Sequence, residues 1–499
     1  MARAVQLARG HVPTLESYDA LPYGSVPVAE SHIERLAATA ALMGMVAPDT
    51  LRPRVLELGC AEGGNLIPMA FDLAGGEFVG VDLSAQQVDA GQKLIGQLGL
   101  TNIRLEQRDI AGGLDDLGDF DFIIAHGLYS WVPQAVRVKI LDVCGRQLRR
   151  GGIAYISFNV LPGWHMRGVL RNFLRSRVSG ALTPAAQVEQ ALALLRTMLP
   201  AWQARASHEA RLLVSETEHL LGVSASYLYH EYLTDINEPC LFADFVTAAH
   251  AAGLKYVADT DLTAMLPDAA AAAALAAVDG MDDRVQREQF LDYLAIRKFR
   301  RALLTRIDTE VADWPQAQAI RDLAFHADLT CDEELDFGSD TPQRFVLRDG
   351  GGNSVTIAHP LAKAAAMVLA SACPSRIDCA DLLAEAQALV SEYGTAQWAD
   401  DVAGFEWAWI ELWAQQAIQP ATVARQFPDQ PGAKPRAHAL AQAQAMSGIV
   451  ATARHGALRL DAAGCALLRS CDGSREIAAH GAIGHALQVF LRAGLLVDG

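Results

Sequence analysis

Residues 55–65 read VLELGCAEGGN, and this stretch decides the fold class. Its first four residues form an apolar run typical of a β-strand, and the glycine-rich turn after them opens onto LIPMA, which is typical of the start of a helix. A strand, a glycine turn and a helix in this order bring backbone N–H groups and a helix N-terminus up to a nucleotide-like ligand. We expect Gly59 and Gly63 to let the backbone approach that ligand, because glycine lacks a Cβ atom and adopts positive φ readily.

Four further strand candidates follow at residues 77–82, 102–106, 121–125 and 152–158, and helical patterns separate most of them. Alternation of strands and helices favours an α/β fold with a parallel sheet covered on both faces. Ligands of such sheets bind beyond the C-terminal ends of the strands. Asp82, Asp109 and His126 follow three of these ends, so one ligand could contact all of them. Asp82 comes 23 positions after Gly59, close to the roughly 20 expected of a carboxylate that binds ribose hydroxyls.

These residues resemble the class I S-adenosylmethionine-dependent methyltransferases. Glu57-x-Gly59-x-Ala61-x-Gly63 is similar to the first motif of that family, with Ala61 where a glycine is common. The resemblance implies a Rossmann-like seven-stranded sheet and S-adenosylmethionine as the cofactor. It also implies that the cofactor is contacted by Glu57, Gly59, Cys60, Ala61, Gly63, Asn65, Asp82, Leu83, Gln87, Asp109, Ile110, His126 and Gly127.

A nicotinamide dinucleotide is the competing cofactor. Its fingerprint requires G-x-G-x-x-G, whereas the same spacing here gives Gly59-x-Ala61-x-x-Gly64. The missing second glycine matters, since the pyrophosphate must approach the backbone closely at that position. Glu57 would repel a pyrophosphate but would suit an ammonium group or a sulfonium. These two features favour the methyl donor.

Further motifs narrow the resemblance to methyltransferases joined to a methyltransferase regulatory domain. They are YDALPY at 18–23, HGLYSWVP at 126–133, PGWH at 162–165, and HEYL and NEP at 230–233 and 237–239. Characterised members of this family include bacterial lysine methyltransferases of outer-membrane proteins. The resemblance therefore implies a lysine-bearing protein substrate and a homodimer.

Composition limits the classes of partner and the cellular compartment that we expect for this protein. The chain has 499 residues, a formal net charge of −17 and 51% hydrophobic residues. An acidic balance opposes nonspecific nucleic-acid binding, which needs a cationic face, and suits a basic protein substrate. The eight cysteines are scattered without zinc-site spacing, so we expect no metal site and reduced thiols. The chain shows no apolar run long enough to span a bilayer, and we expect a cytoplasmic protein without membrane insertion.

Pattern and resemblance together divide the chain into six parts. We expect an N-terminal arm and helix at 1–50, a cofactor-binding methyltransferase domain at 51–165 and 241–267, a helical insertion for dimerisation or capping at 166–240, a helical part of the regulatory domain at 268–320, a middle α+β domain at 321–425, and a small winged-helix-like module at 437–499.

Three expectations concern the later part of the sheet and the regulatory domain. We place the sixth strand at 254–258 and the seventh near 263–266. Residues 284–307 show a long helical pattern. The basic cluster of Arg297, Lys298, Arg300 and Arg301 is interpreted as a solvated face of that helix, not as a nucleic-acid site.

Methyl transfer from a sulfonium is an in-line displacement, so the enzyme must position the acceptor and needs no covalent nucleophile. A lysine amine must first lose its proton, and burial among aromatic side chains lowers its pKa. Aromatic faces also attract alkylated cations. We predict an acceptor pocket formed by Tyr129, Trp131, Trp164, His165, Tyr18 and Tyr23; for the two tryptophans a role in the core is an equal alternative.

Two other function classes remain open from the sequence. A small-molecule or natural-product methyltransferase would use the same cofactor site. A regulatory protein that binds the cofactor without catalysis is disfavoured by the intact set of Gly59, Gly63, Asp82 and Asp109.

Overall fold

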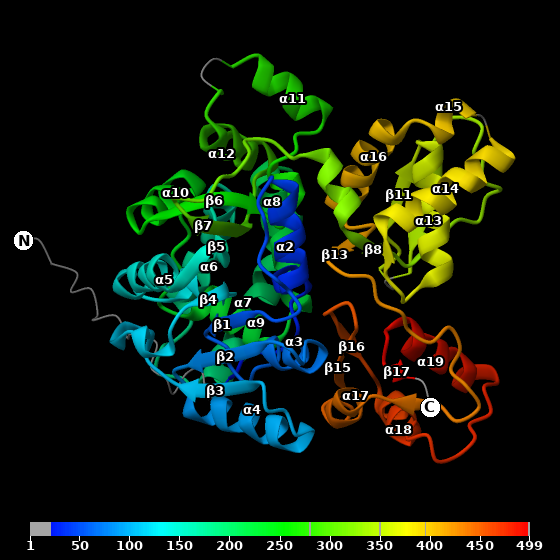
Figure 1. The fold of residues 1–499 in the computed structure, drawn as a ribbon. Coiled ribbons are helices and arrows are strands. Elements are labelled where there is room, and N and C mark those ends of the chain that lie inside the picture. Colours follow the sequence, from blue (N-terminus) through cyan, green and yellow to red (C-terminus); the bar gives the residue numbers. More distant parts are fainter. Residues whose placement is uncertain (1–20, 279–280, 349–350, 395, 498–499) are drawn as a thin grey trace, which may run out of the picture.

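One seven-stranded sheet forms the centre of the N-terminal part of the chain (Figure 1). The computed structural model describes residues 21–278, 281–348, 351–394 and 396–497. The strands are β1 (Arg54–Leu58), β2 (Glu77–Asp82), β3 (Ile103–Gln107), β4 (Phe120–Ala125), β5 (Leu148–Asn159), β6 (Leu254–Asp259) and β7 (Phe299–Arg306). Their order is β3-β2-β1-β4-β5-β7-β6, and only β7 runs antiparallel to its neighbours. The predicted Rossmann-like α/β sheet is confirmed.

Helices cover both faces of the sheet, because successive side chains of the strands point to opposite faces and both sets are apolar. Val55, Phe78 and Phe122 belong to the core on one face, whereas Leu56 and Val79 belong to the core on the other. The helices α2 (Ile33–Leu42), α3 (Leu66–Asp72) and α4 (Ala85–Leu98) contribute to the first core, and α5 (Gln134–Gln147) and α10 (Phe242–Ala251) to the second.

A helical insertion follows β5, as predicted. It comprises α6 (Gly163–Arg177), α7 (Pro184–Gln203), α8 (His208–Gly222), α9 (Ala225–Leu228) and a π-helical turn at Tyr229–Leu233. These elements share a hydrophobic core of their own, and the partly buried Leu21 packs against that core. The chain then returns to the sheet through α10 and β6.

The prediction of the seventh strand is wrong. Residues Leu262–Ala264 form a 3-10 turn, and the last strand is β7 at Phe299–Arg306, inside the segment predicted as one long helix. Only the first half of the segment 284–307 is helical, as α12 (Arg284–Ala295). Arg300 and Arg301 hid the strand, because they broke its apolar pattern. The solvated helix face is therefore also wrong, since Arg300 is fully buried in the sheet.

The middle module shares a core with the sheet. It contains β8 (Ala324–His326), β9 (Leu329–Thr330), β10 (Gln343–Leu347), β11 (Ser354–Ile357), β12 (Ile377–Asp378), β13 (Gln419–Ala421), α13 (Pro360–Ala372), α14 (Cys379–Tyr393), α15 (Ala396–Ala399) and α16 (Val402–Ala414). The strands β10 and β11 form an antiparallel pair. Side chains of α2 and of this module lie in one continuous cluster with the first face of the sheet.

The C-terminal module has a separate core. Its elements are β14 (Arg436–Ala437), α17 (Ala439–Gln444), β15 (Ile449–Ala451), β16 (Ala457–Arg459), α18 (Ala462–Ser470), α19 (Gly481–Arg492) and β17 (Leu496–Val497). It lies below the middle module and beside α3 and α4 in Figure 1. The Ala-rich helix α11 (Ala269–Ala276) precedes α12. Among the described residues, none of the helices combines the length and the apolar character that a membrane span requires.

Candidate cofactor and acceptor site

The glycine turn after β1 has the backbone that the sequence predicted. Gly59 and Gly63 adopt φ of +73° and +75°, and Ala61 lies in the same left-handed region at +49°. The N–H groups of Gly59 and Cys60 donate to the carbonyl of Val81 at 2.8 and 3.1 Å, which ties the turn to β2. The Cys60 side chain is buried, so this residue can offer a ligand only its backbone.

Asp82 anchors the same turn from the C-terminal end of β2. Its Oδ2 accepts the N–H of Ala61 at 2.9 Å, and its Oδ1 accepts the N–H of Ser84 at 2.9 Å. The carboxylate therefore stands at the sheet edge in a fixed orientation, at the position expected of an acid that binds ribose hydroxyls. Leu83 is half exposed beside it, an arrangement suited to the face of a purine ring.

The remaining predicted contacts on this side are also near strand ends. Asp109 is exposed after β3 and accepts the N–H of Ala111 at 2.9 Å, while Ile110 beside it is buried. Gln87 lies in the first turn of α4, where its N–H donates to Oγ of Ser84 at 3.2 Å. The structure thus brings the predicted ribose and base contacts to one edge.

Glu57 is a buried carboxylate directly behind the turn. Asn65 Nδ2 donates to its Oε1 at 2.7 Å, whereas its Oε2 is buried with no hydrogen-bond partner in the described chain. Burial raises the pKa of Glu57 to about 8, against the hydrogen bond from Asn65, and the charge of Asp82 adds to the rise. A cationic ligand would supply the missing partner and favour the ionised form. An ammonium or sulfonium group therefore fits this site, and a pyrophosphate does not.

His126 and Gly127 follow β4 at the same edge. His126 Nδ1 lies 2.9 Å from the hydroxyl of Tyr155, and the N–H of Gly127 donates to Oγ of Ser157 at 2.8 Å. Burial, with the nearby charge of Arg301, lowers the pKa of His126 to about 4. His126 is therefore a neutral positioning group at physiological pH.

The N-terminal segment crosses the glycine turn. The N–H of Gly64 donates to Oγ of Ser25 at 2.8 Å, and the N–H of Val28 donates to Oδ1 of Asn65 at 2.9 Å. A Cβ atom on Gly64 would lie 2.2 Å from the carbonyl oxygen of Ser25. This crossing therefore depends on glycine at position 64.

The residues predicted for the acceptor pocket occupy different surroundings. Tyr129 packs edge-on against Phe245 in the core on the second face of the sheet, at 5.3 Å between ring centroids. Trp164 lies at the start of α6, 6.0 Å from the ring of Tyr232. Trp131 is buried, His165 is exposed, and Tyr18 lies outside the described residues.

Tyr23 contacts Glu231, a carboxylate that the sequence prediction did not include. Its hydroxyl donates to Oε1 of Glu231 at 3.3 Å, and its ring lies 5.1 Å from that of His230. Glu231 is buried on the π-helical turn, a distortion frequent at functional sites. Burial raises its pKa to about 7, although Arg167, Tyr23 and Asn159 oppose the rise.

Asn159 places Glu231 relative to the sheet. It is the last residue of β5, and its Nδ2 donates to Oδ1 of Asn237 at 3.0 Å. Nδ2 of Asn237 in turn donates to the backbone carbonyl of Glu231 at 3.1 Å. The HEYL segment is thereby fixed to the C-terminal end of β5, on the edge that carries the cofactor turn.

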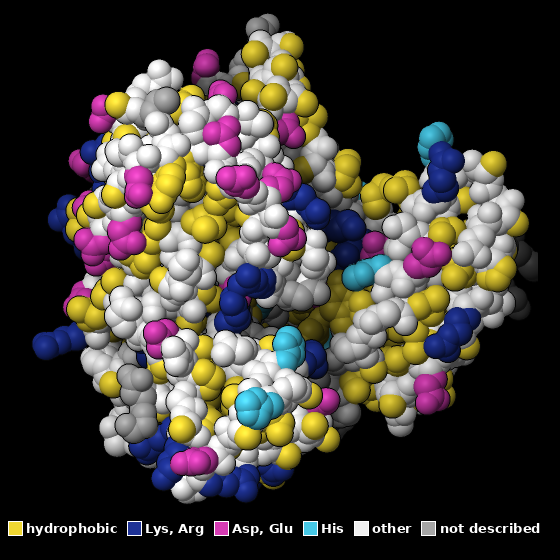
Figure 2. Space-filling model, turned by 90° about the vertical axis from the view of Figure 1, so that its right-hand side faces the viewer, with side chains coloured by type: hydrophobic (Ala, Val, Ile, Leu, Met, Phe, Trp, Pro, Cys, Tyr) yellow, Lys and Arg dark blue, Asp and Glu magenta, His cyan; other side chains and the backbone are white. Residues whose placement is uncertain are grey.

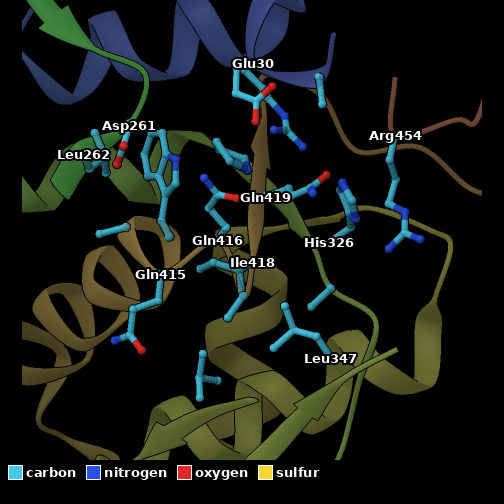
Figure 3. Close-up of a pocket in the computed structure, with 18 of the residues that line it drawn as sticks. Glu30, Asp261, Leu262, His326, Leu347, Gln415, Gln416, Ile418, Gln419 and Arg454 are labelled. Carbon is cyan, nitrogen blue, oxygen red and sulfur yellow. The ribbon is translucent and has the colours of Figure 1, made fainter. Parts of the chain in front are cut away.

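A cavity of about 490 Å³ opens where the sheet, the middle module and the C-terminal module meet. Its lining includes Glu30 before α2, Asp261 after β6, His326 of β8 and Arg454 of the C-terminal module. Figure 3 shows Glu30 and Arg454 extending toward the space from different sides. Figure 2 shows a depression in this face of the molecule, with basic, histidine and hydrophobic side chains around it.

Electrostatic contacts connect this cavity to the cofactor edge through Glu30. Burial raises the pKa of Glu30, but Arg301 and Arg35 outweigh it and hold the pKa below its usual value. His126 contributes to the same lowering. Glu30 is therefore an ionised carboxylate between the cavity and the residue that follows β4.

The sheet order, the single antiparallel strand β7, the glycine turn and the acid after β2 together define a class I methyltransferase fold. Residues 55–152 match the family model described as "Methyltransferase domain". Residues 224–306 match the model described as "Predicted methyltransferase regulatory domain". The protein RP028 of Rickettsia prowazekii is 32% identical over 233 residues, which cover 47% of this chain and 93% of that protein. The chain belongs to the S-adenosylmethionine-dependent methyltransferases that carry a methyltransferase regulatory domain.

Two other similarities are more extensive along this chain. Protein RP789 of Rickettsia prowazekii is 36% identical over 302 residues, which cover 60% of this chain and 55% of that protein. This chain thus matches only about half of the length of RP789. The structure of PKMT2 from Rickettsia typhi, also solved in complex with AdoHcy, superposes with TM-scores of 0.82 and 0.83. It is 23% identical, and the alignments cover 95% and 96% of this chain and all of that one. This likeness shows that the fold extends through the middle and C-terminal modules. The predicted cofactor, S-adenosylmethionine, is confirmed by the match of residues 55–152 to the methyltransferase domain.

Four residues of the site were missed by the sequence prediction. Glu231 belongs to the HEYL motif at 230–233, and its position beside aromatic residues was the available signal. Asn159 ends a predicted strand, which could have identified it. Glu30 and His455, a histidine of the C-terminal module that hydrogen-bonds to Asn65, gave no signal, because their positions depend on contacts between distant parts of the chain. Among the described residues, no group of three or more His, Cys, Asp or Glu side chains is placed to hold a metal ion.

Proposed function

We propose that this protein transfers a methyl group from S-adenosylmethionine to lysine side chains of a protein substrate. The observation that carries the methyl-transfer part is the glycine turn at Gly59–Gly63, which Asp82 fixes while Glu57 keeps an unpaired oxygen behind it. Asp82 and Leu83 would hold the nucleoside end of the cofactor. The turn and Glu57 would hold its amino-acid end. The bound cofactor supplies an electrophilic methyl group on a sulfonium.

The acceptor assignment is supported by the surface that the cavity offers and by the net charge of the chain. The cavity lies beside the cofactor edge and is bounded by two additional modules, which offers a large partner more surface than a bare methyltransferase domain would. Its lining contains three carboxylates (Glu30, Asp261 and Asp328) and two arginines (Arg35 and Arg454), so it can contact charged side chains of either sign on a protein partner. The net charge of −17 favours encounter with basic substrates. The name of PKMT2, whose whole length this fold covers, suggests the same acceptor class.

Glu231, which lies outside the lining of that cavity at the end of β5, is suited to accept the proton that a lysine ammonium must lose. It is fixed to the end of β5 and has a pKa of about 7, so it exchanges protons near neutral pH. The deprotonated amine then attacks the methyl carbon while the carbon–sulfur bond breaks. The products are a methylated lysine and S-adenosylhomocysteine, and the released proton resides on Glu231 until it passes to solvent. Tyr23 orients the carboxylate through its hydroxyl.

A homodimer through the helical insertion completes the proposal. Several apolar side chains of the insertion are exposed in a single chain: Met166, Val169, Leu182 and Leu212. Contiguous exposed apolar patches are typical of contact surfaces. The insertion also carries Glu231, so a dimer contact there would stabilise the acceptor side.

Incubation of the protein with methyl-labelled S-adenosylmethionine and a bacterial lysate, followed by size separation, tests the acceptor class. We expect label in discrete protein bands, with mass spectrometry placing it on lysine. The Asp82→Ala variant should give no label and serves as the control for other enzymes in the lysate. Label that depends on the wild-type protein but appears only among small molecules would replace the protein substrate with a small one. Label in neither fraction would contradict catalysis.

A further inference from the structure

The C-terminal module reaches into the cofactor site with one histidine. His455 lies in the turn between β15 and β16, and its side chain is almost fully buried. Its Nε2 donates to Oδ1 of Asn65 at 2.8 Å, across 390 positions of sequence. Its ring also lies 4.9 Å from the ring of His32, which precedes α2. The C-terminal module therefore contacts a residue of the cofactor site through His455.

Asn65 connects His455 to Glu57, the carboxylate behind the glycine turn. Its Oδ1 accepts from His455 and from the N–H of Val28, and its Nδ2 donates to Oε1 of Glu57 at 2.7 Å. The hydroxyl of Ser31 also lies within hydrogen-bond distance of both atoms of the amide, at 3.2 and 3.0 Å. An amide that accepts on one side and donates on the other has its orientation determined by both partners. The donor from the C-terminal module thus helps to keep the Nδ2 group facing Glu57.

The turn that carries His455 is held firmly. The N–H of His455 donates to the carbonyl of Thr452 at 2.9 Å, and Arg376 of the middle module donates to the carbonyl of Ala453 at 3.0 Å. Arg376 also pairs with Glu34 of α2. His455 has φ of +55°, a left-handed conformation that a non-glycine residue keeps only where its surroundings enforce it.

We propose that His455 is a positioning residue of the cofactor site, which acts through Asn65 to set the orientation of Glu57 toward the cationic end of the cofactor. Docking of the C-terminal module then controls cofactor affinity. A partner that pulls this module away from the sheet would release the cofactor. This inference rests on the proposed function in that the ligand is S-adenosylmethionine.

A purely structural role for His455 makes a different prediction. It would stabilise the junction between modules without changing how binding depends on pH. The ionisable groups around the pathway decide what that dependence reports. Those facing Glu57 are Asp82, Cys60 and Tyr155, and those facing His455 are His32, Arg35 and Arg376. Because the hydrogen bond from Asn65 lowers the pKa of Glu57, its loss would move the pH midpoint of binding upward.

Calorimetric titration of the full-length protein with S-adenosylmethionine between pH 6 and 9 tests the proposal. We expect His455→Ala to weaken binding by about tenfold, the effect of one lost buried hydrogen bond, and to move the pH midpoint upward. His455→Gln retains an N–H donor near the Nε2 position and should restore most of the affinity. His485→Ala, at an exposed position of α19 in the same module, should bind as the wild type does.

Two results would overturn the inference. One is a folded His455→Ala variant with wild-type affinity and an unchanged pH midpoint. The other is hydrogen exchange of the wild-type protein in which the cofactor leaves the protection of residues 452–456 unchanged, a measurement that does not depend on any variant folding. A wild-type protein that binds no S-adenosylmethionine would instead overturn the proposed function itself.

Discussion

Nη1 of Arg300 lies 2.8 Å from Oε2 of Glu288, and both side chains are excluded from solvent where β7 meets α12. Asp292 accepts from the same guanidinium at 3.0 Å, and the ring of Phe242 lies 3.8 Å from its central carbon. This cluster attaches the regulatory segment to the antiparallel strand of the sheet. The last part of the methyltransferase sheet and the regulatory domain are therefore one folded unit.

Replacement of Arg300 by alanine should strongly destabilise the protein. The change leaves Glu288 and Asp292 buried without their cation, which typically costs about 3–5 kcal/mol. Urea unfolding followed by circular dichroism measures the loss. Arg150→Ala, at a side chain that is 82% exposed, is the matched control and should change the free energy of unfolding little. A loss of less than about 1 kcal/mol in Arg300→Ala would contradict the importance of the cluster.

Asp82→Ala should abolish measurable S-adenosylmethionine binding. The variant loses the expected ribose contacts and also the acceptor that holds Ala61 and Ser84, so about 100-fold weaker binding or more is expected. Calorimetry gives the affinity, and circular dichroism checks the fold. Asp89→Ala, at an exposed position of α4, controls for loss of negative charge. Undiminished affinity in Asp82→Ala would refute the site.

Glu57→Gln should stabilise the fold at pH 8 while weakening cofactor binding. The folded-state pKa of Glu57 is raised from 4.5 to about 8, so the folded protein holds a proton that the unfolded chain releases. The free energy of unfolding therefore falls as pH rises from about 4.5 through about 8, and the neutral amide avoids that loss. We expect a gain of about 1–2 kcal/mol at pH 8 and none at pH 4.

The exposed Glu62→Gln variant on the same turn controls for charge in this experiment, and its stability should follow the pH profile of the wild type. Equal slopes for Glu57→Gln and the wild-type protein between pH 5 and pH 8 would show that Glu57 is ionised throughout. The electrostatic description of the turn would then be incorrect.

Glu231→Gln should slow methyl transfer far more than it affects cofactor binding. A base with a pKa of about 7 becomes active as it loses its proton, so the wild-type rate should rise through pH 7 and then level off. Removal of the base should lower kcat by about 100-fold and abolish that rise. Single-turnover rates between pH 5.5 and 9 provide the test, with Glu218→Gln on the exposed side of α8 as control. A variant with the wild-type profile would remove Glu231 from the mechanism.

Light scattering at micromolar concentration should give twice the 53.5 kDa mass of one chain. Val169→Asp, on the exposed face of the insertion, should convert the dimer to a monomer, because a charge would be buried in the contact. Val138→Asp is equally exposed but lies on α5, and it should leave the dimer intact. A wild-type protein that remains monomeric would contradict the dimer.

The sequence predicted those parts of the structure that depend on local pattern. The turn at Gly59–Gly63, the acid at Asp82 and the helices of the insertion follow from residues close together in the chain. The seventh strand was misplaced because Arg300 is compensated by carboxylates from α12 and β6, which no local pattern reveals. Because charged residues are mostly exposed, a sequence pattern alone does not distinguish a buried ion cluster from a solvated surface.

The prediction of the acceptor pocket was limited in the same way, because it too relied on local sequence. Tyr129 and Trp131 follow a strand end in sequence, but their backbone turns back into the protein and buries both side chains. Tyr23 and Glu231 meet although 208 positions separate them, and only the fold brings them together. Residue type alone therefore predicts neither which of these aromatic side chains are buried, since Tyr23 is 41% exposed, nor the long-range contact of Tyr23 with Glu231.

The close passage of Ser25 over Gly64 provides a criterion for reading related sequences. Any substitution at this position adds a carbon atom where the Ser25 carbonyl already stands, so the N-terminal segment could not keep its path. Paired glycines at positions 63 and 64 therefore indicate a chain whose amino-terminal strap is threaded across the cofactor turn. A relative with a side chain at the second position must lead its amino terminus elsewhere, and its cofactor would enter and leave by a more open route.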